Sequence, residues 1–380
     1  MPANGYDVAI IGGGFAGTAI AWQLSKRGYC VLLLEAHSLG SGTSGASAGR
    51  AQVAESHRGA HLDLVLAGLA QLDTLQKELD YNFEWRRLGN LMLIEQDHHW
   101  AWWVEQVEYL TKRGMSAKML NRAELREMEP LLNASRFRGA AWCLEGHLNP
   151  LKYCHAFAQA ARRHGAVILQ NTPVIDLKRA GSRVTAIHTA NERFFANVVL
   201  VTAGAWTAEV LRQVDIWLPV QFTHAEAIIT EPLAPSLNNH VGLADFYETI
   251  HNAKQAVSVG VAQQKNGTLL ITEAVEMSPK IHRNNSCWGT PGMAKDFLGL
   301  FPSLANARVI RAWAAPSPFL PDEHPAIGWV PGVENLFVAT CFHLTITTIP
   351  VISRLVADII LGQGVDPVLE AFSPTRFGNW

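Results

Sequence analysis

The chain has 380 residues, enough for two domains, yet only 17% of them are charged, against an average of about 25% in soluble proteins. Its 31 Lys and Arg residues against 33 Asp and Glu residues give a formal net charge of −2, so there is no basic excess to bind nucleic acid. A composition that is 48% hydrophobic also excludes a disordered chain, and charges or glycines interrupt the longest apolar stretches, so no transmembrane segment is expected.

The N-terminal segment predicts a β-α-β unit. Residues 6–11 form a short apolar run typical of a buried parallel strand, residues 15–27 have helical periodicity, and residues 30–35 form a second apolar run. Parallel strands connected in this way belong to a sheet whose faces are covered by helices. No basic region precedes the first apolar run, so we expect no signal peptide and a cytoplasmic protein.

In the remaining chain, segments with helical periodicity of apolar residues alternate with segments typical of strands. Further helices are expected over residues 57–79, 98–113, 122–128 and 347–362, and strands over residues 167–169, 183–188, 197–202 and 334–340. Between residues 216 and 275 the pattern becomes β, with Lys265-Asn266-Gly267 as a hairpin turn. In the helix expected over residues 98–113, helical periodicity places Trp103 on the buried face and leaves Trp102 exposed.

These patterns predict an α/β protein with a discontinuous first domain. A Rossmann-type dinucleotide-binding domain is expected from residues 1–85, 150–215 and 305–380. A substrate domain of the α+β class, built on an antiparallel sheet, is expected from residues 86–149 and 216–304. The cysteines form no close pair, so we expect reduced thiols and no metal site: Cys30, Cys143, Cys154, Cys287 and Cys341.

The strongest motif is a glycine fingerprint between the first strand and the first helix. Gly12, Gly14 and Gly17 allow a tight turn, a close approach of backbone to pyrophosphate, and close helix packing, and Phe15 and Ala16 open the helix whose N-terminus faces the phosphates. Glu35, followed by Ala36, ends the second strand, where an acidic side chain binds ribose hydroxyls. The sequence therefore predicts dinucleotide binding, and the alternative is a purely structural glycine turn.

Five partial motifs in the same order resemble the flavin-dependent D-amino-acid and glycine oxidase superfamily. This superfamily includes sarcosine oxidases and the flavin subunits of opine, hydroxyproline and cyanide-forming glycine dehydrogenases. Besides the fingerprint and Glu35, the similar segments are GSGTSGASAG (40–49), VVLVTAGAW (198–206) and PDEHPAIG (321–328). The resemblance covers nearly the whole chain and implies FAD as the cofactor.

The resemblance also implies roles for individual residues. Thr43 and Ser44 would hydrogen-bond phosphate or ring oxygens, and Val174 would offer backbone groups to adenine. Further cofactor contacts are implied for Gly49, Gly204, Trp206, and the segment of His343, Leu344, Thr345 and Ile346 beside the flavin. For Trp206 the alternative is a core aromatic, and for Ser44 a capping hydroxyl.

Two positions depart from the family pattern. Ser317 stands where amino-acid-oxidising members usually have an arginine that binds the substrate carboxylate. Thr345 stands where the flavin-facing loop usually has glycine, so the loop backbone should differ. His343 is the candidate catalytic residue, which could orient a substrate or accept a proton. The candidate substrate-binding residues are other basic groups, with Arg50 and His251 preferred and His224 and Arg311 as alternatives. A structural role is the alternative for each.

The family resemblance predicts FAD-dependent oxidation of the C–N bond of an amino acid or N-substituted amino acid, such as an opine, hydroxyproline or glycine. The missing arginine and the weakly charged composition favour a subunit of a dehydrogenase complex, with other protein subunits and an electron acceptor as partners. Association with the inner face of the cell membrane stays open. The alternatives are a non-catalytic FAD-binding structural or electron-relay subunit, and an NAD-dependent dehydrogenase.

Overall fold

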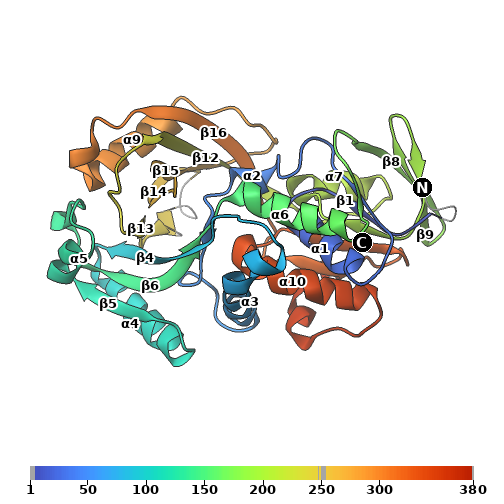
Figure 1. Cartoon of the computed structure of the whole chain (residues 1–380), viewed down its shortest axis with the longest axis horizontal. Helices are drawn as coiled ribbons and strands as arrows, with labels where there is room; N and C mark the ends of the chain where they lie inside the picture. Colours follow the sequence, from blue (N-terminus) through green and yellow to red (C-terminus); the bar gives the residue numbers. More distant parts are fainter. Residues whose placement is uncertain (1–4, 247, 250–253, 379–380) are drawn as a thin grey trace.

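The structure is a computed structural model that describes residues 5–246, 248–249 and 254–378. Its elements build two large sheets that lie beside one another along the long axis of the molecule (Figure 1). All strands of one sheet come from residues 1–85, 150–215 and 305–380, the segments expected to form the dinucleotide-binding domain, and residues 86–304 supply most of the other sheet. None of the helices in these ranges combines the length and the apolar character that a membrane crossing requires.

The first sheet has the strand order β17-β18-β11-β1-β2-β7 and is parallel except for β17. Alternate residues of β1 point to opposite faces, so Val8 packs against helices and Ala9 packs against a small three-stranded layer. The sheet strands are β1 (Tyr6–Ile11), β2 (Val31–Leu34), β7 (Val167–Leu169), β11 (Ala196–Val201), β17 (Ala326–Trp329) and β18 (Leu336–Thr340).

Helices cover one face of the first sheet, and the small layer covers the other. This arrangement explains the continuous apolar runs of the parallel strands, which are buried on both faces. The covering helices are α1 (Phe15–Ser25), α3 (Ala60–Glu78), α6 (Pro150–Arg163) and α10 (Thr345–Ile360). The opposite face is covered by β8 (Val174–Ala180), β9 (Arg183–Thr189), β10 (Arg193–Phe194) and α7 (Thr207–Arg212).

The second sheet has the strand order β16-β12-β15-β14-β13-β4-β6-β3, and β5 pairs with β6. It is antiparallel as predicted, apart from the parallel pair of β13 and β4. Its strands are β3 (Arg50–Ala51), β4 (Arg86–Ile94), β5 (Ala117–Asn121), β6 (Gly139–His147), β12 (Gln221–Pro232), β13 (Asn239–Leu243), β14 (Gln255–Gln263), β15 (Thr268–Met277) and β16 (Val309–Phe319).

Two strands of the second sheet come from segments that the sequence assigned to the dinucleotide-binding part. Strand β16 pairs with β12, beginning at Gln221↔Phe319. It lies in the segment 305–380, which was expected in the dinucleotide-binding domain. Strand β3 pairs with β6 although it directly follows the cofactor loop. Sheet membership depends on distant partners, which local periodicity does not report. Both strands carry the chain from one sheet to the other next to the predicted site.

Further helices and turns complete the structure. They are helices α2 (Thr43–Ala46), α4 (Asp97–Lys112), α5 (Arg122–Met128) and α9 (Gly289–Leu300), and the 3₁₀ turns Ala134–Arg136, Gly204–Trp206, Pro302–Leu304, Pro367–Phe372 and Pro374–Phe377. In α4, Trp103 is buried and Trp102 is half exposed, as its helical periodicity predicted. Cys287 is exposed, whereas Cys143, Cys154 and Cys341 are buried.

Helices α3 and α10 are in close contact at Gly68, which leads to a stability prediction. A Cβ atom at Gly68 would lie 1.8 Å from the Thr347 carbonyl oxygen, so Gly68→Ala must push the helices apart. We expect a loss of about 3 kcal/mol in the free energy of unfolding. Gly299→Ala is the matched control, because its Cβ would meet nothing within 4 Å and alanine favours a helix by up to about 1 kcal/mol. Chemical denaturation measures both, and equal midpoints for the two variants would contradict the packing argument.

Candidate functional site

A cavity of about 960 Å³ connects the carboxyl ends of the parallel strands with the face of the second sheet. Residues that directly follow β1, β2, β11 and β18 line one end, among them Gly12, Glu35 and Thr202. Residues of β12, β14, β15 and β16 line the other end. The carboxyl edge of a parallel sheet is where α/β folds bind nucleotides, so the first end is the candidate cofactor site and the second the candidate substrate site.

The glycine fingerprint has the geometry of a phosphate-binding turn. Gly12 adopts φ +112°, and a Cβ there would lie 2.6 Å from the Thr202 carbonyl oxygen. A Cβ at Gly17 would lie 1.9 Å from the Gly12 carbonyl oxygen, so only glycine lets α1 pack against the turn. An ideal Cβ atom at Gly14 would lie 2.9 Å from Ser44 Oγ. The helix N-terminus therefore opens into the cavity without side chains that would exclude a pyrophosphate.

Glu35 closes the cofactor end of the cavity. Its carboxylate accepts hydrogen bonds from the backbone N–H groups of Gly13, at 2.7 Å, and His37, at 2.9 Å. Ala36 and Val174, which were also predicted to contact the cofactor, line the same wall. The carboxylate is thus fixed beside the glycine turn, where it can accept hydrogen bonds from ribose hydroxyls.

The loop 40–49 joins the cofactor end to the second sheet. Ser44 Oγ accepts a hydrogen bond from the Phe15 N–H at 3.1 Å, while Thr43 Oγ1 donates to the Pro316 carbonyl. Trp313 Nε1 donates to the Ala46 carbonyl at 3.1 Å. In this structure Thr43 and Ser44 therefore hold the loop in place, and their predicted bonds to the cofactor stay predictions.

Three other predicted cofactor contacts take different positions around the cavity. Trp206 lines the wall, and the Arg283 guanidinium lies over its ring at 5.6 Å. Gly204 adopts φ +54° and also lines the cavity. Gly49 adopts φ +77° with an ideal Cβ 2.2 Å from the Leu148 carbonyl oxygen, so it shapes the loop without lining the cavity.

The segment 343–346 turns into α10 along the cavity wall. Leu344 adopts the left-handed conformation, φ +52°, and Thr345 begins the helix while its Oγ1 donates to the Phe342 carbonyl at 3.1 Å. The left-handed residue is therefore the one before the position where glycine was expected, which explains how threonine is accommodated. The His343 ring stacks on His61 at 5.6 Å. Burial lowers the pKa of His61 to about 4, so this neighbour is neutral.

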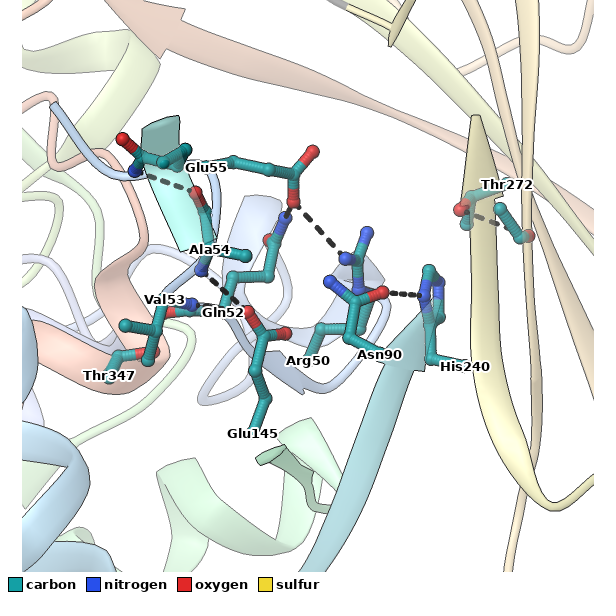
Figure 2. A network of polar contacts seen from close by, with 12 residues as sticks. Arg50, Gln52, Val53, Ala54, Glu55, Asn90, Glu145, His240, Thr272 and Thr347 are labelled. Carbon is teal, nitrogen blue, oxygen red and sulfur yellow. Dashed lines mark hydrogen bonds and ion pairs between the residues drawn. The ribbon is translucent and has the colours of Figure 1, made fainter. Parts of the chain in front are cut away.

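Arg50 enters the substrate end of the cavity from β3. Its side chain is 13% exposed, and its guanidinium pairs with Glu55 at 3.2 Å. Glu55 also accepts a hydrogen bond from Gln52 Nε2 at 2.6 Å (Figure 2). Arg50 Nε is buried and has no hydrogen-bond partner among the described residues, so this guanidinium donor is unsatisfied. An unsatisfied guanidinium donor can bind a carboxylate ligand.

A buried carboxylate holds the segment that carries Arg50. Glu145 accepts hydrogen bonds from the backbone N–H groups of Val53 and Ala54, both at 2.7 Å (Figure 2). Burial raises the pKa of Glu145 to about 7, and the positive charge of Arg50 opposes this rise. Glu145 is thus a positioning residue for the loop between β3 and α3.

Sequence reasoning missed Glu273, which lines the substrate end of the cavity from β15. The sequence does contain a signal for it, an acidic residue inside the apolar run LLITEAV. Acidic side chains are rarely buried without a partner, so this position indicates a special role. The other basic candidates are placed elsewhere: His224 is buried outside the cavity lining, and exposed Arg311 lies against Trp313. His251 lies outside the described residues. Ser317, which stands where the family usually has an arginine, lines the cavity.

Comparisons with known proteins cover nearly the whole chain. A family model described as FAD dependent oxidoreductase matches residues 7–359. The chain is 29% identical to glycine oxidase from Geobacillus kaustophilus, over 98% of this chain and 97% of that one. It is 25% identical to hydrogen cyanide synthase subunit HcnC from Pseudomonas aeruginosa, over 97% of each chain. The crystal structure of Geobacillus kaustophilus glycine oxidase superposes with a TM-score of 0.88, 26% identity and 98% coverage of both chains.

Proposed function

Because the chain belongs to the family of FAD-dependent oxidoreductases, we propose that it oxidises the C–N bond of an amino acid or N-substituted amino acid as one subunit of a dehydrogenase complex. Glycine, hydroxyproline and opines are the preferred substrates. FAD is the cofactor, and the glycine turn, Glu35 and the 343–346 segment would hold it. When bound, FAD supplies the acceptor for the hydride that leaves the carbon next to nitrogen.

The position of Arg50 is the observation that carries the proposal. The usual carboxylate-binding arginine is replaced by Ser317, but Ser317 and Arg50 line the same cavity. The unsatisfied Nε of Arg50 offers a substrate carboxylate a charge-assisted hydrogen bond, while its ion pair with Glu55 fixes the guanidinium. Arg50 would thus orient the substrate from a different wall of the pocket, and a degenerate pocket is not needed to explain Ser317.

The exposed edge of the second sheet supports the subunit role. In the described part of the chain β16 ends the strand order, so its outer edge is unpaired. Ile310, on this strand, is 61% exposed, and its neighbour Val309 is 44% exposed. Apolar edge strands are favourable sites for another chain to bind. HcnC, a similar protein, is named as a subunit of hydrogen cyanide synthase.

Anaerobic mixing tests the proposed activity. The FAD-loaded chain is mixed with glycine, sarcosine, proline, hydroxyproline and an opine, and absorbance of the oxidised flavin is followed. We expect at least one of these amines to bleach the flavin band. If none does, the non-catalytic FAD-binding subunit becomes the better explanation. A separate arm measures light scattering and oxygen turnover, since rapid oxygen-dependent turnover by a monomer would rule out the subunit role.

A further inference from the structure

Glu273 is held in the cavity by an irregularity in the centre of the second sheet. It lies on β15, between β12 and β14. Its neighbours Thr272 and Ala274 have partners on both adjacent strands, whereas both registers shift at Glu273 itself. Such a bulge redirects a side chain, and bulges are frequent next to active sites. Here the redirected carboxyl group lines the cavity that Arg50 enters.

The Glu273 carboxylate has no partner within the described ranges. No hydrogen bond or ion pair reaches it there, and its interactions are the attraction of Arg50 and the repulsion of Glu55. Arg50 is already paired with Glu55. Burial raises the pKa of Glu273 to about 7. An unpaired carboxylate at this place costs stability, which is typical of a group that binds a ligand.

The two charged groups match the two charges of an amino acid. Arg50 and Glu273 line the same cavity, and Arg50 keeps a buried Nε donor without a partner while the Glu273 carboxylate is unpaired among the described residues. A zwitterion satisfies both groups at once, whereas a simple carboxylate leaves Glu273 without a partner. Leaving a desolvated group unpaired is an effective way to reject a ligand.

We propose that Glu273 binds the ammonium group of the substrate while Arg50 binds its carboxylate, which makes the pocket specific for zwitterionic amino acids and N-substituted amino acids. This inference rests on the proposed function and assigns the substrate class of the same site. Hydroxy acids and simple carboxylic acids of the same shape are rejected because they carry no positive charge.

Two ligands of nearly equal shape test the proposal without any turnover. Trimethylglycine carries a quaternary nitrogen that a flavin cannot oxidise, and 3,3-dimethylbutanoate has carbon in its place. Their dissociation constants for the FAD-loaded full chain are measured by calorimetry and by perturbation of the flavin spectrum. We expect trimethylglycine to bind at least about tenfold tighter near pH 8, through the charge attraction between its nitrogen and Glu273, and Glu273→Gln to remove this preference while FAD content stays the same.

The pH dependence gives a second, independent measurement. Glu273 must be ionised to attract the positive charge, so the preference for trimethylglycine over 3,3-dimethylbutanoate should fall as the pH is lowered through about 7. Glu145, which holds the segment of Arg50, also has a pKa of about 7 but acts on both ligands alike. The Glu273→Gln variant should show no preference at any pH. The charged and titratable groups that face Glu273 are Arg50 and Glu55, and the same cavity is also lined by Glu226, Arg283, Glu323 and His343.

Glu276→Gln is the matched control. Glu276 lies on the same strand, accepts a hydrogen bond from Gln255 Nε2 at 2.9 Å, and does not line the cavity. This variant should keep the preference of the unmodified chain. Equal binding of the two ligands, binding of neither, or a preference that survives Glu273→Gln overturns the proposal. If the preference is present but no amine bleaches the flavin, the zwitterion site stands and the proposed oxidation fails.

Discussion

Replacing Gly17 with alanine should yield a protein that no longer binds FAD. The added methyl group would lie 1.9 Å from the Gly12 carbonyl oxygen and 2.7 Å from Thr202 Oγ1. Helix α1 would have to move away from the turn, and its N-terminal N–H groups would then leave the position in which they can face a pyrophosphate. We expect the purified variant to be colourless and its FAD affinity to fall by at least about 1,000-fold, which corresponds to about 4 kcal/mol.

FAD content per chain and fluorescence titration with added FAD measure this loss. The variant may be compared with Gly299→Ala, which also adds one methyl group to a helical glycine but meets no atom within 4 Å. The Gly299 variant should stay yellow. A Gly17 variant that purifies with one FAD per chain would show that the turn tolerates a side chain, and the fingerprint would lose its role.

Replacing Arg50 with methionine should remove most of the affinity for amino-acid substrates. Methionine keeps the length of the side chain but cannot donate a hydrogen bond or neutralise the substrate carboxylate. A loss of about 3 kcal/mol, or roughly 100-fold in the dissociation constant, is expected from one charge-assisted interaction. Because Arg50 lowers the pKa values of Glu145 and Glu273, both should rise in the variant and become protonated over a wider pH range.

Anaerobic titration with an amine that bleaches the flavin separates binding from reduction. The amine concentration that gives half-maximal bleaching of the flavin should rise strongly in Arg50→Met. Adding Glu55→Gln to the variant removes the buried partner charge, so a recovered melting temperature without recovered affinity would identify Arg50 as a binding residue. Arg311→Met is the control, because Arg311 is exposed and does not line the cavity. Unchanged affinity in Arg50→Met would remove Arg50 from the substrate site.

The cofactor end of the site was predictable from sequence because its signals are local. The glycine spacing, the strand before it and the acid that ends the next strand all lie within residues 6–35. The hairpin at Lys265-Asn266-Gly267 was equally accessible, since the turn needs a residue such as Gly267 at φ +89°. In each case a few neighbouring residues determine the conformation.

The substrate end depends on contacts between distant segments. Glu273 enters the cavity because β12 and β14 shift register on either side of it, and neither shift is encoded near residue 273 alone. Arg50 was identified only by its place after the cofactor loop, while its partner Glu55 was missed. Residues 309–319 were expected in the dinucleotide-binding domain, and their place in the second sheet was missed because the pairing of β16 with β12 joins residues about 90 positions apart in the chain.

The hydrogen bonds from Thr43 to Pro316 and from Trp313 to Ala46 give cofactor binding a thermodynamic role in folding. They attach the loop beside the glycine turn to the strand that carries Ser317, so a ligand that stabilises the loop also stabilises the second sheet. At a free FAD concentration 1,000 times the dissociation constant, this linkage adds about 4 kcal/mol to the folded state. Loss of FAD therefore weakens the substrate pocket itself as well as removing the redox group.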